Sequence, residues 1–293
     1  MQPKIETLPA ILNGDRSFNR FNDAFVKFLF STEKHKKFLI DLLNAVFDER
    51  RPSCISGRVV DVTFEDRELP TFHIDEKYGR LDIRAITDSG QIVNIEVQST
   101  IDRTLKERNV FYFSKIYSAQ QVKGLAYSKL KPVIIINLLA INYFPNRQTY
   151  ITSYSLREDE DYELMSDKVN FIYIEARKCQ ELGDRNRSRL TRWMTYLTYP
   201  SQEEVFQLAK DDEIIAEAME VEKVFFRTPE EMREYEAREK YDMDIISAED
   251  NGRAEGRIEA LLETAKNLLK LGLSVEQIKA ATHLNDEQLA QLR

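Results

Sequence analysis

Two acidic residues that could bind a divalent cation, Asp82 and Glu96, lie in two neighbouring segments of the sequence. Segments 80–87 and 91–98 alternate apolar and polar residues with the period of half-buried β-strands. The short connection between them contains Gly90, and a three-residue hairpin loop needs a glycine in the left-handed conformation. The pattern predicts a β-hairpin that carries one carboxylate on each strand.

The register of this hairpin decides whether the two carboxylates meet. If a three-residue loop closes on Thr87 and Gln91, Asp82 faces Glu96, and their Cβ atoms lie about 4.5–5.5 Å apart. Like charges opposed in this way destabilise a sheet, and a divalent cation is the simplest compensation. A four-residue loop would instead set Asp82 opposite Val97, on the other face.

The two faces of the hairpin differ in polarity. Antiparallel sheets commonly solvate one face, so an ordinary wet surface is the alternative to a metal site. The polar face consists of Asp82, Arg84, Asn94, Glu96 and Gln98. The apolar face, which is expected to pack in a core, consists of Leu81, Ile83, Ala85, Val93, Ile95 and Val97.

Composition narrows the class of protein. The chain has 293 residues, of which 42% are hydrophobic and 31% charged, as in ordinary globular proteins. Its first residues lack a basic stretch followed by an apolar run, and no segment has the length of a membrane span. We therefore expect a cytoplasmic protein with no membrane partner. Two cysteines and three scattered histidines disfavour structural zinc and catalysis by either residue type.

The net charge of −8 is unevenly distributed. Counted along the sequence, residues 1–209 carry 30 basic and 29 acidic side chains, whereas residues 210–250 carry 6 basic and 15 acidic ones. The body is therefore near neutral, and residues 102–131 are locally basic. A local basic face can contact phosphates despite the negative total.

The order of predicted elements indicates an α/β domain with a mixed sheet flanked by helices. The apolar run 132–140 is typical of a strand buried on both faces. We assign residues 1–200 to this domain and residues 201–293 to a helical C-terminal extension. Helices are expected at 18–47 with a break near Ser31, at 103–127 and from Asp184 onward; strands are expected at 58–64, 80–87, 91–98, 132–140, 149–156 and 169–176.

The extension is expected to combine one long helix with a helix-turn-helix-like tail. Residues 228–260 have the charge pattern of a long solvated or self-pairing helix. Ser274 is expected to cap the first tail helix, and Asn285 or Asp286 the second. Because Arg293 is the only basic residue of the second tail helix, packing or homo-oligomerisation is favoured over DNA reading.

Several short blocks of residues follow one another along the chain in an order that is hard to produce by chance. They are Asp23, Lys27, Leu29 and Phe30 with 42–45; Lys77 with 81–83; Gly90 with 93–98; and Arg108, Tyr112, Tyr117, Gln120 and Gly124. With these blocks the chain resembles the PD-(D/E)XK nuclease superfamily, and more closely its bacterial recombination-promoting nuclease or putative transposase family. The resemblance extends through the 132–140 run to Trp193 and to the tail, and so covers nearly the whole chain.

This resemblance implies a restriction-endonuclease-like core and metal-dependent cleavage of DNA phosphodiesters. Asp82 and Glu96 would hold Mg²⁺, with Mn²⁺ as a substitute, and the carbonyl of Val97 would be a further oxygen ligand. Asp23 matches the acidic position on the first helix, where it would support a metal-bound water or a second ion. A solvent-facing helix carboxylate is the alternative for Asp23.

Gln98 departs from the wider superfamily, which more often has lysine at this position. Lysine stabilises the attacking water and the phosphate by its charge, whereas glutamine is neutral and orients groups only through hydrogen bonds. The closer family also shows glutamine here, so the departure does not imply an inactive site. Gln98 is assigned to the catalytic set with Asp82 and Glu96, and Lys77 to the supporting residues.

The second long helix offers a face for DNA. Arg108, Tyr112 and Lys115 fall on one stripe, so Arg108 and Lys115 are candidate phosphate contacts with Tyr112 in support. Gln120 is expected to brace the metal site or a phosphate. The alternative is that Tyr112, Phe113 and Tyr117 pack on the sheet while the charged side chains are solvated.

Two functions fit these observations. The first is a Mg²⁺-dependent DNA endonuclease of mobile-element, recombination or defence type, which needs both carboxylates and a metal. The second is a noncatalytic nucleic-acid-binding or regulatory protein that keeps the nuclease fold and needs only a basic face. Either protein would have DNA as its partner and would assemble as a homo-oligomer through the helical extension.

Overall fold

The computed structural model describes residues 18–65, 82–121, 124, 126–180, 188–198 and 202–290. The chain divides into two compact units, residues 1–239 and residues 240–293. Lys77 and Leu81, which the sequence assigns to the site and to the core, lie outside the described residues.

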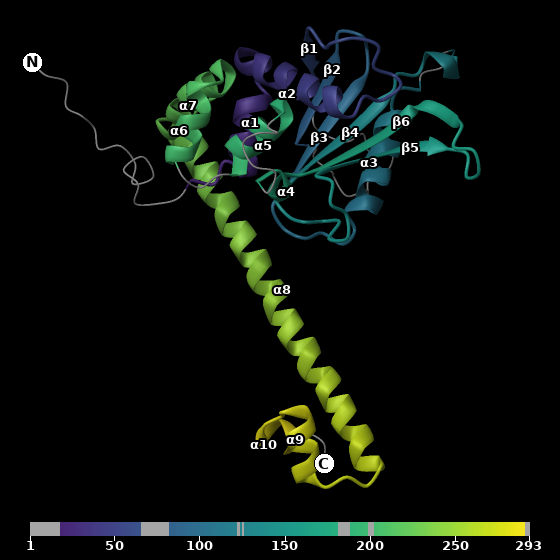
Figure 1. The fold of residues 1–293 in the computed structure, drawn as a ribbon, viewed down its shortest axis with the longest axis vertical. Coiled ribbons are helices and arrows are strands. Elements are labelled where there is room, and N and C mark those ends of the chain that lie inside the picture. The colour runs from purple at the N-terminus through teal and green to yellow at the C-terminus, as the bar shows by residue number, and fades with distance from the viewer. Residues whose placement is uncertain are drawn as a thin grey trace, which may run out of the picture. The chain divides into compact units, whose positions relative to one another are not determined.

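A six-stranded mixed sheet forms the centre of the first unit (Figure 1). The order across the sheet is β1-β2-β3-β4-β6-β5, with β3–β4 and β4–β6 parallel and the other pairs antiparallel. The strands are β1 (Val62–Phe64), β2 (Ile83–Thr87), β3 (Ile92–Gln98), β4 (Val133–Leu139), β5 (Ile151–Arg157) and β6 (Leu164–Glu175). The predicted mixed α/β sheet is confirmed.

β4 lies inside the sheet because every one of its side chains is apolar or amide and all are buried. It pairs in parallel with β3 on one side and with β6 on the other. The expectation that the 132–140 run is covered on both faces is therefore confirmed, and the carboxyl ends of β3, β4 and β6 point in the same direction.

Helices cover both faces of the sheet (Figure 1). The main core joins the sheet to α1 (Asp23–Phe30), α2 (Lys36–Glu49) and α5 (Arg189–Thr198), whereas α3 (Leu105–Ser118) packs on the opposite face. The predicted break near Ser31 is confirmed, because a short 3₁₀ turn, η1 (Glu33–His35), separates α1 from α2. The short helix α4 (Ala176–Gln180) follows β6 directly.

Several elements differ in length from the sequence expectation; β1, for example, begins at Val62 rather than at residue 58. α3 ends at Ser118 rather than near residue 127, and the Ser118 hydroxyl donates to the carbonyl of Lys115 at 3.2 Å, where it competes with the helix backbone. A short turn, η2 (Tyr127–Lys129), precedes β4. β6 begins at Leu164 rather than residue 169, and irregular pairing with β5 over Ser155–Arg157 lengthens this hairpin.

A buried ion pair ties the start of α1 to α7 (Glu213–Phe226), which follows α6 (Gln202–Lys210). Arg20 Nε lies 2.7 Å from Glu222 Oε2, and Tyr196 donates to the same carboxylate oxygen at 3.2 Å. Arg20 is 1% exposed, so its buried positive charge needs the carboxylate of Glu222 for compensation. The pair helps to set the position of α1, which carries Asp23 and Lys27.

The second unit contains the distal part of the 42-residue helix α8 (Pro229–Lys270), together with α9 (Val275–Thr282) and α10 (Asp286–Ala290). Its small core consists of Ala265, Ile278, Leu284 and Leu289. Ser274 caps α9 in a reciprocal capping box with Gln277, and Asn285 forms the same pair of bonds with Gln288 at α10. Both predicted caps are confirmed. Among the described helices, none has a stretch long and apolar enough to cross a lipid bilayer.

Candidate active site

The hairpin between β2 and β3 closes in the register that brings the two carboxylates together. Arg84 pairs with Asn94, and the N–H of Thr87 donates to the carbonyl of Gln91 at 3.0 Å. Gly90 adopts φ of 93° at the end of the loop, where a side chain would be strained. The three-residue loop is confirmed, and the four-residue alternative is wrong.

Asp82 and Glu96 meet at the open end of this hairpin. The backbone N–H of Asp82 donates to the carboxylate of Glu96, and the N–H of Val97 donates to Oδ2 of Asp82 at 2.8 Å. Asn94 donates from Nδ2 to Oε1 of Glu96 at 2.9 Å. These bonds fix both carboxylates, so their proximity is built into the paired strands.

The polar face of the hairpin is not a solvated surface. Asn94 is 0% exposed and Glu96 is 5% exposed, because α3 lies over this face of the sheet. Ile116 of α3 packs on the floor of the sheet with Tyr112 partly buried beside it. The alternative of a wet face is therefore wrong at Asn94 and Glu96, and burying a carboxylate here must be compensated.

Lys27 of α1 supplies part of this compensation. Its Nζ lies 2.7 Å from Oδ2 of Asp23 and 3.1 Å from Oδ1 of Asp82. The three side chains are 15–17% exposed. Asp23 therefore lies at the site, one helical turn before Lys27, rather than on a solvent-facing surface as the alternative for this residue held.

Burial and mutual repulsion perturb both hairpin carboxyls. Burial, followed by the nearby charge of Asp82, raises the pKa of Glu96 to about 8. Burial and the charge of Asp23 also raise the pKa of Asp82, although Lys27 and the N–H of Val97 oppose this shift. Without a cation, the pair therefore favours a protonated state near neutral pH, which is the expected behaviour of two carboxylates that share one site.

Gln98 continues the polar face, and its side chain is held by two neighbours. Arg108 donates from Nη2 to Oε1 of Gln98 at 2.8 Å, and Nε2 of Gln98 donates to the carbonyl of Thr100 at 3.0 Å. Nη1 of Arg108 also lies 2.8 Å from Oδ2 of Asp102. Gln98 is thus oriented by the protein itself, through Thr100 on one side and the guanidinium of Arg108 on the other.

Several buried polar atoms around the site have no hydrogen-bond partner among the described residues. They are Oδ1 of Asp23, Oδ1 of Asn94 and Nε of Arg108. Buried groups of this kind normally find a partner, so they mark where water or a ligand belongs. The carboxylates of Asp82 and Glu96 form a pair of hard oxygen donors, which fits a Mg²⁺ ion that keeps part of its water shell, and the unpartnered oxygens mark where such waters could bond.

The other predicted site residues, Tyr112, Lys115 and Gln120, differ in burial and in the groups that they contact. Burial, followed by the charge of Glu96, raises the pKa of Tyr112, whose ring centre lies 6.0 Å from the guanidinium carbon of Arg108. Lys115 is exposed, with Nζ 5.6 Å from the centre of the Phe111 ring. Gln120 bonds both backbone groups of Lys131, at 2.8 Å and 3.2 Å, so in this structure it braces the start of β4.

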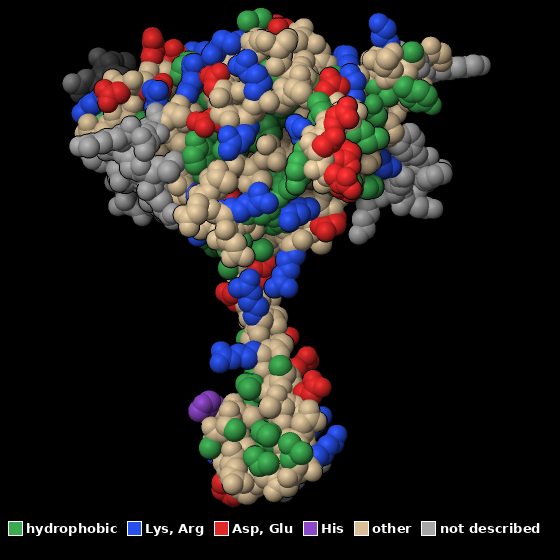
Figure 2. Space-filling view, turned by 45° about the vertical axis from the view of Figure 1, so that its right-hand side comes forward, with side chains coloured by type: hydrophobic (Ala, Val, Ile, Leu, Met, Phe, Trp, Pro, Cys, Tyr) green, Lys and Arg blue, Asp and Glu red, His purple; other side chains and the backbone are tan. Residues whose placement is uncertain are grey.

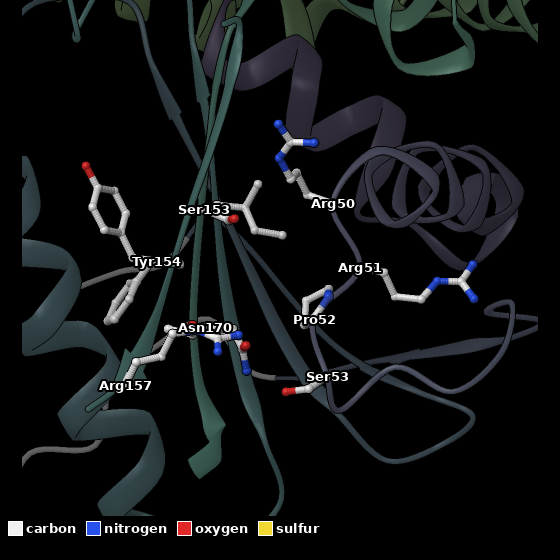
Figure 3. Close-up of a pocket in the computed structure, with 11 residues that line it drawn as sticks. Arg50, Arg51, Pro52, Ser53, Ser153, Tyr154, Arg157 and Asn170 are labelled. Atoms are coloured by element: carbon white, nitrogen blue, oxygen red, sulfur yellow. The ribbon is translucent and has the colours of Figure 1, made fainter. Parts of the chain in front are cut away.

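A separate cavity of about 110 Å³ lies between the loop after α2 and the strands β5 and β6 (Figure 3). It is lined by Arg50, Arg51, Pro52, Ser53, Ser153, Tyr154, Ser155, Arg157, Asn170, Phe171 and Ile172. Arg51 extends away from the strands in Figure 3 and lies 3.5 Å from Asp48, while Arg157 bonds Ser155 and the carbonyl of Tyr162. None of the predicted site residues lines this cavity.

Sequence reasoning missed two features of the centre. Lys27 enters the sequence analysis only as part of the family resemblance, although its spacing of four residues from Asp23 places both on one helix face. Arg108 is predicted as a DNA contact, and its bond to Gln98 joins residues ten positions apart on different elements. That contact leaves no periodic signal in the sequence.

A mixed sheet flanked by helices, with Asp82 just before its second strand and Glu96 in its third, is consistent with a nuclease fold. The family model for PD-(D/E)XK nuclease family transposases matches residues 20–252, and the chain therefore belongs to this family. No curated protein and no solved structure matches the chain significantly. The predicted family resemblance is confirmed, and the family supports a nuclease or transposase-like function.

Proposed function

We propose that this protein is a metal-dependent DNA endonuclease that hydrolyses phosphodiester bonds, in a role connected with mobile elements, recombination or defence. The observation that carries the proposal is the opposition of Asp82 and Glu96, the first largely buried and the second fully buried, and both bonded across paired strands. Two buried like charges are costly to keep for stability alone. A divalent cation would compensate both charges, and its use in cleaving a phosphodiester substrate agrees with membership of a nuclease family.

Asp82 and Glu96 would hold Mg²⁺, or Mn²⁺ in its place, with the carbonyl of Val97 as a further donor. When bound, such an ion polarises a phosphate and lowers the pKa of a coordinated water. Gln98, held by Arg108 and Thr100, would position the attacking water through its amide. Arg108 would stabilise the charge that develops on the phosphate, a role that the neutral Gln98 is unable to fill.

Phosphate contacts would extend along α3 to Lys115. Arg108 is 31% exposed at its side chain and bonds Gln98, so it lies between the site and the surface, whereas Lys115 is exposed. Contacts of this kind position a duplex without reading its bases. Tyr112 and the supporting residues Asp23, Lys77 and Gln120 complete the set that we assign to the site and its surroundings.

We also propose that the protein is cytoplasmic and self-associates through its helical extension. Figure 2 shows hydrophobic side chains gathered on one face of the C-terminal unit. Leu271 is 76% exposed and Val275 is 48% exposed in this unit, so apolar area is available there for a second copy. Light scattering of the full chain and of a Leu271→Glu variant tests this assembly; identical masses at all concentrations would contradict it.

The activity is tested by incubating purified protein with supercoiled plasmid and with single-stranded DNA across a panel of divalent ions. We expect nicked and linear products with Mg²⁺ or Mn²⁺ and none after chelation. The Asp82→Ala variant serves as the control for a contaminating nuclease. DNA binding without turnover under every condition would instead support the noncatalytic function.

A further inference from the structure

Lys27 stands between two carboxylates of the candidate site. Its Nζ lies 2.7 Å from Asp23 and 3.1 Å from Asp82, and no side chain of the three is more than 17% exposed. The ammonium therefore sits where it compensates both carboxylates at once, away from most of the solvent. A lysine used only for solubility would extend into water.

The charges of the described residues around the candidate site favour a particular number of bound metal ions. Asp23, Asp82 and Glu96 contribute three negative charges, and Lys27 contributes one positive charge, which leaves two negative charges. Arg108 is balanced by Asp102 at 2.8 Å. One divalent ion neutralises the remainder, whereas a second would leave a net charge of +2 in a largely buried site.

The geometry favours the same number. Oδ2 of Asp23 is engaged by Lys27, and among the described residues no three acidic, histidine or cysteine side chains converge as a complete metal cluster. Asp82 and Glu96 remain as one opposed pair. Mg²⁺ is usually bound through one or two carboxylates and retains several waters, so this pair suffices for a single ion.

We propose that Lys27 takes the place of a second divalent ion, so that the site binds a single metal ion through Asp82 and Glu96. Lys27 is a positioning residue in this role, because it acts through Asp23 and Asp82. This assignment rests on the proposed metal-dependent function and adds to it the number of ions and the residue that limits it. Asp23 then serves as the partner of Lys27 rather than as a metal ligand.

The test counts bound ions directly. Mn²⁺ is titrated into the full chain while the electron paramagnetic resonance signal of free Mn²⁺ is recorded. We expect a stoichiometry of one for the wild type and of two for Lys27→Met, because removal of the ammonium releases Asp23 as a ligand and lowers the net charge of a site with two ions from +2 to +1. Lys27→Arg keeps the charge and should bind one ion, and the double variant Asp23→Asn with Lys27→Met should return to one.

A lysine in a comparable ion pair elsewhere provides the matched control. Lys36 lies 2.7 Å from Asp61, and its side chain is 37% exposed. Lys36→Met removes the same charge from the surface of the same domain, so the number of bound ions should stay at one. A rise in this variant would show that total charge, rather than the position of Lys27, governs the stoichiometry.

Circular dichroism and thermal unfolding establish that each variant is folded, and Lys27→Gln repeats the test if Lys27→Met does not fold. A wild type that binds two ions would overturn the role of Lys27 without any variant. The same holds if a folded Lys27→Met or Lys27→Gln binds only one ion. A wild type that binds no ion and cleaves no DNA would instead refute the proposed metal-dependent function itself.

Discussion

The guanidinium of Arg108 donates a hydrogen bond from Nη2 to Oε1 of Gln98, with 2.8 Å between the two atoms. Position 98 is where the wider superfamily more often has a charged lysine, and here it carries a neutral amide. Arg108 therefore brings a positive charge to within one hydrogen bond of that position, from α3 rather than from the strand. The amide of Gln98 is proposed to position water and the guanidinium of Arg108 to stabilise charge, so the two residues have distinct predictions.

Replacement of Arg108 should slow the chemical step, whereas replacement of Lys115 should weaken only DNA binding. Loss of one preorganised donor to developing charge costs on the order of 10²–10³ in rate, and we expect an effect of this size for Arg108→Ala. Single-turnover cleavage at saturating DNA measures it. Lys115→Ala is the matched control on the same helix: its rate should stay unchanged, and the salt slope of binding should fall by about one.

Gln98 should affect the cleavage rate more than binding. Gln98→Ala removes the amide that would position water, so the single-turnover rate should fall while DNA affinity persists. Gln98→Lys should retain or raise activity when the metal is saturating, because an ammonium stabilises charge on the phosphate. An Mg²⁺ and Mn²⁺ titration for each variant separates weaker metal binding from slower chemistry. Equal rates for the wild type and Gln98→Ala would remove Gln98 from the mechanism.

Asp82→Ala and Glu96→Ala should each abolish cleavage while the fold is retained. Loss of a residue that merely supports a metal ligand already costs about 10–100-fold in activity, so loss of a ligand should exceed that range. Each change also removes repulsion between buried carboxylates, so the metal-free free energy of unfolding should hold or rise slightly. Urea unfolding in the presence of a chelator measures this. Wild-type digestion by either variant would contradict the site assignment.

The raised pKa of Glu96 predicts how metal-free stability depends on pH. Folding lifts this pKa from an ordinary 4.5 to about 8, so between these values the folded chain holds a proton that the unfolded chain has lost. The contribution of Glu96 to stability is therefore greatest at low pH and is lost as the pH rises toward 8. Thermal unfolding with a chelator should show Glu96→Gln gaining on the wild type across this window. A constant difference would contradict the shift.

The buried pair of Arg20 and Glu222 should be important for stability. Glu222→Ala leaves Arg20 without its buried counter-charge and should destabilise the protein by about 3–5 kcal/mol. Urea unfolding followed by circular dichroism measures the loss. Glu220→Ala, which removes an exposed carboxylate paired with Lys223 on the same helix, should change stability by less than about 1 kcal/mol.

Local sequence signals were sufficient to predict the hairpin and the sheet. Period-two alternation and Gly90 favour the observed β2–β3 register, which the structure then decides over the four-residue loop that the sequence left open. The apolar run of β4 predicts a central strand in the same way. These signals are local, so they can be read without knowing what packs on the sheet.

Only the tertiary structure decides what surrounds the carboxylates. The sequence left the polar face of the hairpin open to solvent as an alternative, and α3 covers Asn94 and Glu96 through contacts distant in sequence. Lys27 reaches Asp82 across 54 intervening positions, and Arg108 reaches Gln98 from another element. Periodicity assigns a side chain to a face of its own element, whereas the packing of elements determines which charges meet, and the chemistry of the site depends on that meeting.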